Sequence, residues 1–208
     1  MNERLVERTL RAFSDDLASS AAVPGGGSAA AYAGAMGAAL AGMVGRIAER
    51  KETGEATTAL IADADNLRSD FIRLVDDDSA AYARVREAMR MPKTSDDEKR
   101  ARTERIQTAL LAASRVPLEV ATTSRRLLDL CERAVERAAT ATVSDIGVGA
   151  FLAETALRGA ALNVMINLAS VKDDAQVKAL SEDLDRAVDG ADAQRKRITD
   201  FVESRIAR

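Results

Sequence analysis

The sequence predicts an all-α fold, organised as a single domain in a bundle of about six helices. Hydrophobic residues make up 47% of the 208 residues but aromatic residues only 3%, so alanine, leucine and valine dominate. This composition favours helices over strands. Apolar residues also recur at alternating steps of three and four over long stretches, which is the period of one helix face. No repeat or low-complexity linker divides the chain, so residues 1–208 are expected to form one domain.

The composition also excludes several classes of function. Charged residues amount to 30% and nearly balance, with a net charge of −3, so no basic surface for nucleic acid is expected. Cys131 is the only cysteine and there is no histidine. An intramolecular disulfide, a histidine metal site and Ser-His or Cys-His catalysis are therefore excluded. Acid–base chemistry has to rely on Asp, Glu, Lys, Tyr or the single Cys.

The N-terminal third raises the questions of secretion and of membranes. The first residues, MNERLVERTLRAF, alternate charged and apolar residues, so we expect no signal peptide and a cytoplasmic protein. No charge occurs from Leu17 to Gly45, a stretch long enough to span a bilayer. Pro24 and three glycines interrupt it, however, and its few large side chains form one stripe among Ala and Gly. We predict a buried central helix and no membrane contact.

Six helical segments are expected from periodicity and from capping residues. Ser28 is the predicted N-cap of the second segment, and Ser144 with Asp145 caps the fifth. Ser95 and Glu98 have the spacing of a capping box at the start of the fourth. The expected ranges are about 2–20, 28–49, 55–90, 96–138, 144–171 and 174–206.

The third segment is the most informative because an aspartate occupies its apolar seam. Steps of four and three run from Leu60 to Ala88, and every residue at these positions is apolar except Asp78. Burying an unpartnered carboxylate is costly. Two explanations remain open: an ion pair or cap contact with a neighbouring helix, or a carboxylate that faces a ligand in a cleft. We favour the second because Asp76 and Asp77 lie beside it.

A pair of asparagines stands out in the fifth segment, which is apolar over most of its surface. Asn163 and Asn167 are four residues apart and therefore lie on one helix face. Buried amides need hydrogen-bond partners. They either join neighbouring helices or line a pocket.

An ordered series of short motifs runs from residue 24 to residue 173. Each is weak alone, but their order and spacing make coincidence improbable. The series consists of Pro24-Gly25-Gly26-Gly27-Ser28, Gly34-Ala35-Met36-Gly37, Asp77-Asp78 with Ala81-Tyr82, Met91-Pro92-Lys93, Glu98-Lys99 with Arg102, Ile106-Gln107, Val116-Pro117-Leu118, Ser144-Asp145, Asn163-Val164 with Asn167, and Asp173. Together they resemble the family of cyclodeaminase domains of formiminotransferase-cyclodeaminase and stand-alone methenyltetrahydrofolate cyclohydrolases.

The resemblance implies an all-α homodimer that binds a tetrahydrofolate derivative as its substrate, with no metal and no further cofactor. Cyclohydrolases add water to the bridging carbon of 5,10-methenyltetrahydrofolate and open the ring to formyltetrahydrofolate, whereas cyclodeaminases close a formimino group and release ammonia. Because no formiminotransferase domain accompanies the sequence, a cyclohydrolase is expected. A cyclodeaminase, or a degenerate folate-binding helical dimer, is the alternative.

The same resemblance supplies candidate site residues. Asp78 and Asp145 are the candidate catalytic carboxylates, one as base and the other as pterin anchor, and Asp145 is equally explained as a helix cap. Glycine N–H groups at a helix start suit a carboxylate or water, and a lysine or arginine suits the glutamate tail. The candidate substrate-binding residues are Gly25, Gly26, Gly27, Ser28, Lys93, Arg102, Gln107, Ser144, Asn163 and Asn167.

Two segments depart from the family pattern. Ala138-Ala139-Thr140-Ala141 stands where Gly-Asn-x-Asn is usual, and Arg50-Lys51-Glu52-Thr53 stands where Lys-Lys-x-Tyr is usual. If these elements contact the substrate, the protein has altered specificity or reduced activity.

Overall fold

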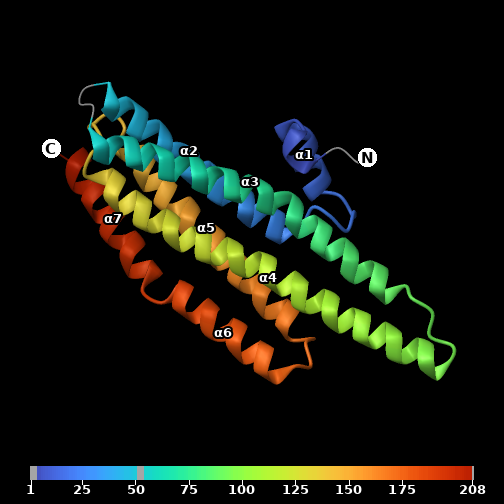
Figure 1. The fold of residues 1–208 in the computed structure, drawn as a ribbon. Coiled ribbons are helices and arrows are strands. Elements are labelled where there is room, and N and C mark those ends of the chain that lie inside the picture. Colours follow the sequence, from blue (N-terminus) through green and yellow to red (C-terminus); the bar gives the residue numbers. More distant parts are fainter. Residues whose placement is uncertain (1–3, 51–53, 208) are drawn as a thin grey trace.

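The computed structural model describes residues 4–50 and 54–207, and these form one all-helical domain (Figure 1). The expected all-α class is confirmed, and the six longer helices α2–α7 make up the bundle. The elements are the 3-10 turn η1 (Leu5–Glu7) and the helices α1 (Leu10–Leu17), α2 (Gly26–Glu49), α3 (Glu55–Met89), α4 (Asp96–Val135), α5 (Val143–Leu168), α6 (Asp174–Val188) and α7 (Ala191–Ile206).

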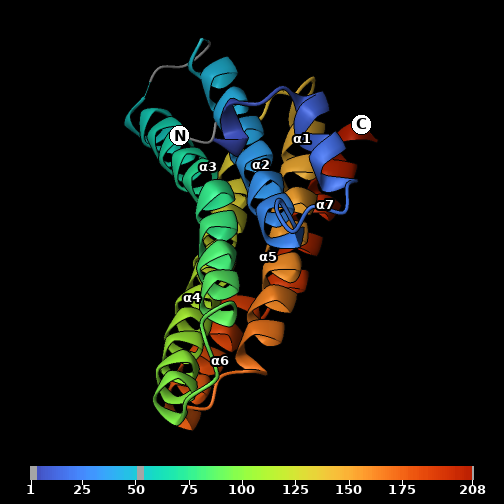
Figure 2. The same cartoon turned by 90° about the vertical axis from the view of Figure 1, so that its right-hand side faces the viewer.

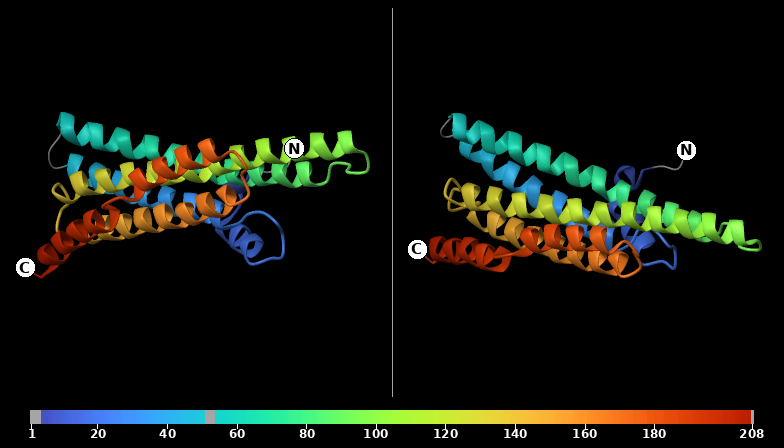
Figure 3. Two further views of the ribbon diagram at one scale, coloured as in Figure 1. Left: turned by 90° about the horizontal axis from the view of Figure 1, so that it is seen from below. Right: turned by 60° about the horizontal axis from the view of Figure 1, so that its bottom comes forward.

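Four long helices form the centre of the bundle. Helix α2 packs against α3 and α5, and α4 packs against α3 and α5, so the four close into a ring (Figure 2). Helices α6 and α7 follow one another along the outside of α4 and α5 (Figure 3). Helix α1 lies outside the bundle, where the Phe13 ring is 5.6 Å from the ring of Tyr32 on α2.

Helix α2 is the buried central helix that its small residues predict. Its length and composition would allow it to cross a membrane, but 67% of its most apolar stretch is buried inside the bundle. A Cβ atom added to Gly34 would lie 2.4 Å from the Phe71 ring, and one added to Gly37 would lie 3.0 Å from the carbonyl oxygen of Gly149. The glycines therefore let α3 and α5 approach the α2 backbone closely.

Of the three predicted N-caps, the one at α4 is confirmed and the two at α2 and α5 are wrong. At α4 the Ser95 hydroxyl accepts a hydrogen bond from the Glu98 N–H at 3.2 Å, and the Glu98 carboxylate accepts one from the Ser95 N–H at 3.0 Å. Helix α2 begins at Gly26, so Ser28 lies inside it. Helix α5 begins at Val143, so Ser144 and Asp145 belong to its first turn. Neither of these two helices has a side-chain N-cap.

The predicted first and last helices are each divided in two. Within the described residues, the first consists of η1 and α1, and Thr9 caps α1 by accepting from the Ala12 N–H at 3.1 Å. The last is broken between α6 and α7, where Gly190 has a φ of 66°. Glycine adopts this left-handed conformation without the steric penalty that other residues meet. Helices α4 and α5 also end three residues earlier than expected, at Val135 and Leu168.

Cys131 lies on α4 and is buried in the core of the bundle, and burial raises the pKa of its thiol to about 12. The thiolate is the reactive form of cysteine. We therefore expect the native protein not to react with Ellman's reagent at pH 8, and the protein unfolded in guanidinium to release one thiol per chain. Rapid labelling of the native protein would contradict the buried position of Cys131.

Candidate functional site

A cavity of about 340 Å³ lies where the start of α2 meets the later parts of α3 and α5. Its volume falls within the range of small-molecule pockets, roughly 300–1,000 Å³. The lining residues are Ala22, Val23, Gly25, Gly26, Gly27, Asp78, Ala81, Tyr82, Val85, Met89, Leu110, Ala113, Asn163, Ile166, Asn167 and Ser170. We call this cavity the Asp78 pocket.

The Asp78 carboxylate is held against the first turn of α2. The Ser28 hydroxyl donates to Asp78 Oδ2 at 2.9 Å. A Cβ atom on Gly27 would lie 2.1 Å from Asp78 Oδ1, so the carboxylate occupies the space that a side chain at residue 27 would need. The N-terminus of α2 carries free N–H groups and a partial positive charge, which favour an anion there. Asp78 thus both contacts a neighbouring helix end and lines a pocket.

Burial gives the Asp78 carboxyl a higher pKa than an exposed aspartate. Hydrogen bonds from the Ser28 hydroxyl and backbone oppose this increase only in part. Its neighbours are engaged elsewhere: Asp76 pairs with Arg4 at 2.8 Å and Asp77 with Arg73 at 2.6 Å. Asp78 has no ion-pair partner within the described residues. A carboxyl group with a raised pKa in a pocket is typical of acid–base sites.

Asn163 and Asn167 both line the Asp78 pocket, and Asn167 also joins α5 to a neighbouring helix. The Asn163 amide nitrogen donates to the Gly159 carbonyl at 2.8 Å within α5. The Asn167 amide nitrogen donates to the Ala113 carbonyl of α4 at 2.9 Å. Each of these bonds uses an N–H and leaves the amide oxygen to accept from a ligand.

Of the other candidates from the N-terminal half, the three glycines line the pocket and Ser28 does not. Gly25, Gly26 and Gly27 form one edge of the cavity. Ser28 is fully buried behind the Asp78 carboxylate, so its hydroxyl holds the carboxylate and does not face a ligand.

Three further candidates do not belong to the pocket wall. Arg102 donates to the Met89 carbonyl at 3.0 Å, near the outer end of the pocket. Gln107 donates to the Ser170 carbonyl at 3.0 Å and supports the segment after α5. Lys93 is exposed in the connection between α3 and α4.

Ser144 and Asp145 lie at the opposite end of α5. Asp145 and Asn163 are 18 residues apart on this helix, which corresponds to roughly 27 Å at the rise of an α-helix. Within one chain, therefore, Asp145 does not join Asp78. The atypical segment Ala138–Ala141 lies at the same distant end. Of the second atypical segment, residues 51–53 lie outside the described part of the chain.

The apolar wall of the pocket was not among the predicted site residues. Tyr82, Val85 and Met89 follow Asp78 on α3 at steps of four, three and four, and therefore share its face. Tyr82 is 46% exposed and Met89 50% exposed, and Ile166 on α5 is also exposed. Large apolar side chains left open beside a carboxylate are what distinguish this wall from a sealed core. The alternating steps of four and three after Asp78 were the sequence signal that could have predicted this wall.

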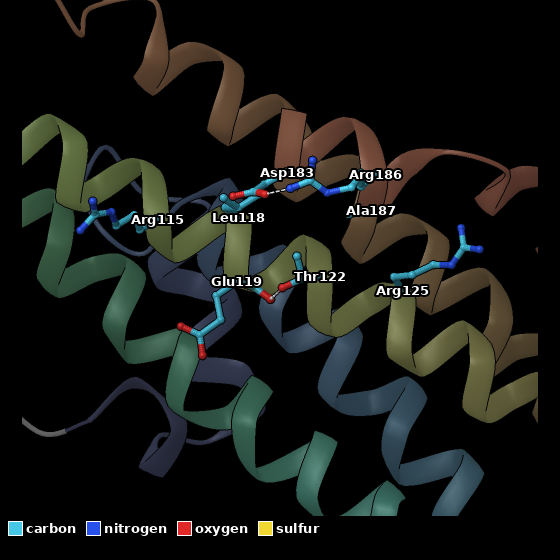
Figure 4. Close-up of a pocket in the computed structure, with 8 residues that line it drawn as sticks. All are labelled: Arg115, Leu118, Glu119, Thr122, Arg125, Asp183, Arg186 and Ala187. Carbon is cyan, nitrogen blue, oxygen red and sulfur yellow. Dashed lines mark hydrogen bonds and ion pairs between the residues drawn. The ribbon is translucent and has the colours of Figure 1, made fainter. Parts of the chain in front are cut away.

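A second hollow of about 460 Å³ lies between α4 and α6. Three arginines line it, Arg115, Arg125 and Arg186, but they do not converge (Figure 4). Arg115 and Arg125 point away from each other, and Arg186 pairs with Asp183. With its charges dispersed in this way, the hollow lacks the focused set of polar groups that marks a ligand site.

Comparisons with known proteins agree on one family. The chain is 37% identical over 202 residues to a methenyltetrahydrofolate cyclohydrolase of Methylorubrum extorquens, covering 95% of this chain and 97% of that protein. It is 34% identical to the formimidoyltransferase-cyclodeaminase of Sus scrofa, covering 99% of this chain but 39% of that longer protein.

A solved structure and a family model support the same family. The crystal structure of a formiminotetrahydrofolate cyclodeaminase from Thermotoga maritima superposes with a TM-score of 0.84 and 27% identity, covering 96% of this chain and 98% of that chain. A family model described as formiminotransferase-cyclodeaminase matches residues 9–186. The chain therefore belongs to the formiminotransferase-cyclodeaminase family.

Proposed function

We propose that the protein is an enzyme of folate one-carbon metabolism that hydrolyses 5,10-methenyltetrahydrofolate to formyltetrahydrofolate. The observation that carries this proposal is the half-buried Asp78 carboxylate in the wall of the 340 Å³ pocket. Similarity to a cyclohydrolase over 97% of that protein's length supports the choice of reaction.

The substrate holds a cationic carbon between two nitrogens, and a carboxylate suits both its charge and its chemistry. Water attacks this carbon, and the proton that the water loses passes to Asp78. The tetrahedral intermediate then collapses: the hydroxyl becomes the formyl C=O, one C–N bond breaks, and the departing nitrogen takes a proton. One proton is released in the net reaction. An ionised Asp78 orients the water, accepts its proton and stabilises the cation.

The rest of the pocket offers groups for binding the folate. The amide oxygens of Asn163 and Asn167 accept hydrogen bonds from N–H groups of the pterin. The open face of Tyr82 and the side chain of Met89 provide an apolar surface for the aromatic rings. In this arrangement the pterin lies toward Asp78, and the glutamate end lies toward Met89 and Arg102.

A second candidate reaction is the ammonia-releasing cyclisation of formiminotetrahydrofolate. It is favoured by the close superposition on a structure named as a formiminotetrahydrofolate cyclodeaminase. This reaction also passes through a tetrahedral carbon between nitrogens, so the same carboxylate serves it.

The two reactions are separated by assaying purified protein on both substrates. With methenyltetrahydrofolate we expect the ultraviolet chromophore to disappear faster than in buffer alone. With formiminotetrahydrofolate we expect little ammonia. Ammonia release as the faster reaction would reverse the assignment, and folate binding without either turnover would identify a degenerate binding protein.

We also propose that the protein is a cytoplasmic homodimer. A second copy would cover the outer face of α5, where the apolar side chains of Leu162 and Met165 are exposed. The free thiol of Cys131 suits a reducing compartment. Light scattering is expected to give twice the chain mass of 22.1 kDa, and a concentration-independent monomer would contradict the dimer.

A further inference from the structure

Ser28 lies directly beneath Asp78 and has more hydrogen-bond partners than one hydroxyl proton can serve. Its Oγ is 2.9 Å from Asp78 Oδ2, 3.1 Å from the Val75 carbonyl oxygen and 3.2 Å from Ser79 Oγ. The residue is 0% exposed, so water does not compete for these bonds. A hydroxyl has one proton to donate and two lone pairs that accept.

We propose that Ser28 is a positioning residue for the reaction, which holds the Asp78 carboxyl in one place in both of its protonation states by redirecting a single proton. This inference rests on the proposed function, in which Asp78 gains and loses a proton in every turnover.

The two states differ by one proton on Asp78 and in the direction of the hydrogen bonds. When Asp78 is ionised, the Ser28 O–H donates to Oδ2. When Asp78 has taken the proton from water, its own O–H donates to Ser28 Oγ, and the Ser28 proton turns to the Val75 carbonyl. Ser28 keeps one proton throughout, and the transferred proton stays on Asp78 until it leaves. All bonds remain within reach without movement of either side chain.

The backbone around the pair keeps this geometry fixed. Ser28 lies in the first turn of α2, and Val75 and Asp78 are three residues apart on α3, so one hydroxyl reaches both. The lack of a Cβ on Gly27 provides the space for Oδ1. A carboxylate held by a rigid, buried partner needs no reorganisation when its charge changes.

No other charge among the described groups takes over this role. On α3 itself, Asp76 and Asp77 are paired with arginines outside the pocket. The described lining residues from α2, α4 and α5 carry no charge, and Tyr82 is the other titratable group in the wall. Ser28 is therefore the dominant group that favours ionised Asp78 against the effect of burial.

The test replaces Ser28 with alanine. The control is the same substitution at a second buried serine, Ser124. Ser124 is equally buried, and its hydroxyl donates to the Val120 carbonyl of its own helix at 2.7 Å. Neither Ser124 nor Val120 lines the pocket. The titration of Asp78 is followed by NMR of carboxyl-¹³C-labelled aspartate, and kcat and KM are measured against pH.

In Ser28→Ala we expect Asp78 to titrate at a higher pH and the acidic limb of the kcat profile to move the same way. At its optimum pH, kcat is expected to fall roughly tenfold or more, because a hydrogen bond to a charged group is lost, with a smaller change in KM. Ser124→Ala is expected to show neither shift. Ser28→Cys, which keeps a weak donor at similar size, is expected to lie between wild type and Ser28→Ala.

An unchanged Asp78 titration in folded Ser28→Ala would overturn the inference, as would equal shifts in Ser28→Ala and Ser124→Ala. If Ser28→Ala does not fold, the comparison of Ser28→Cys with wild type decides by the same criterion. If the wild-type protein turns over no folate, the proposed function fails, but the NMR titration still tests the contact between Ser28 and Asp78.

Discussion

Asp78→Asn is expected to lower kcat for methenyltetrahydrofolate by roughly 10²- to 10⁴-fold, the usual range for removal of a general base. Asparagine has nearly the same shape and fills the same space beside Gly27, but it accepts no proton from water. If Asp78 is the base, kcat falls and KM changes little. If it only anchors the pterin, KM rises and kcat is largely kept. Steady-state kinetics on methenyltetrahydrofolate distinguish the two.

Asp77→Asn is the matched control, because Asp77 is the adjacent carboxylate and pairs with Arg73 on the outside of α3. We expect it to retain wild-type kinetics within about threefold, in line with the small contribution of exposed ion pairs. A loss of activity as large as that of Asp78→Asn would show that the region is sensitive as a whole, and it would contradict a specific role for Asp78.

Asp78→Asn is expected to lower activity but not stability. Burial raises the pKa of folded Asp78, so the folded state binds a proton over a pH window where the unfolded state has already lost it. The free energy of unfolding therefore falls as pH rises from the usual aspartate pKa through the raised one. Asp78→Asn removes this loss, so above the window it is expected to be at least as stable as wild type in urea unfolding.

Gly27→Ala is the second change with a large expected effect. Its new Cβ would lie 2.1 Å from Asp78 Oδ1 and 2.6 Å from its Cγ, so the carboxylate has to leave its place. Alanine is the better helix former, so α2 itself is not weakened. A misplacement of about 1 Å in a catalytic group can cost roughly 10²-fold, and we expect a loss of that size in kcat/KM.

Gly26→Ala is the control for this change. A Cβ atom at residue 26 meets only the Asn163 amide nitrogen, at 3.7 Å, which is an ordinary contact. Both variants add one methyl group to the glycine edge of the pocket, but the methyl group at residue 26 leaves Asp78 in place, so Gly26→Ala is expected to lose much less kcat/KM than Gly27→Ala. Equal kinetics for the two variants would contradict the position of Asp78 against Gly27.

The parts of the fold that could be predicted are those whose signals are local. The seam from Leu60 to Ala88 and the capping box of Ser95 and Glu98 gave α3 and the start of α4 nearly to the residue. The break at Gly190 was missed because the apolar spacing continues across it, and a single glycine did not outweigh that pattern. The early starts of α2 and α5 were missed because neither has a side-chain cap.

The candidate site was predictable where one helix carries the pattern and not where distant segments meet. Asp78 stood out because it interrupts a seam, and Asn163 with Asn167 because they share a face. The true partner of Ser28 lies 50 residues away, so a role as local cap was the simplest interpretation of the sequence. Asp145 follows the family motif in the chain, but the length of α5 separates it from the pocket, and linear order does not reveal that separation.

A crystal structure with bound tetrahydrofolate would show where the substrate lies. We expect the pterin in the Asp78 pocket, with one of its nitrogens or a water at its reactive edge within hydrogen-bond distance of the Asp78 carboxylate, and the aromatic ring beside Tyr82. Folate bound at the far end of α5 near Asp145, or in the hollow between α4 and α6, with the Asp78 pocket left unoccupied, would contradict this expectation.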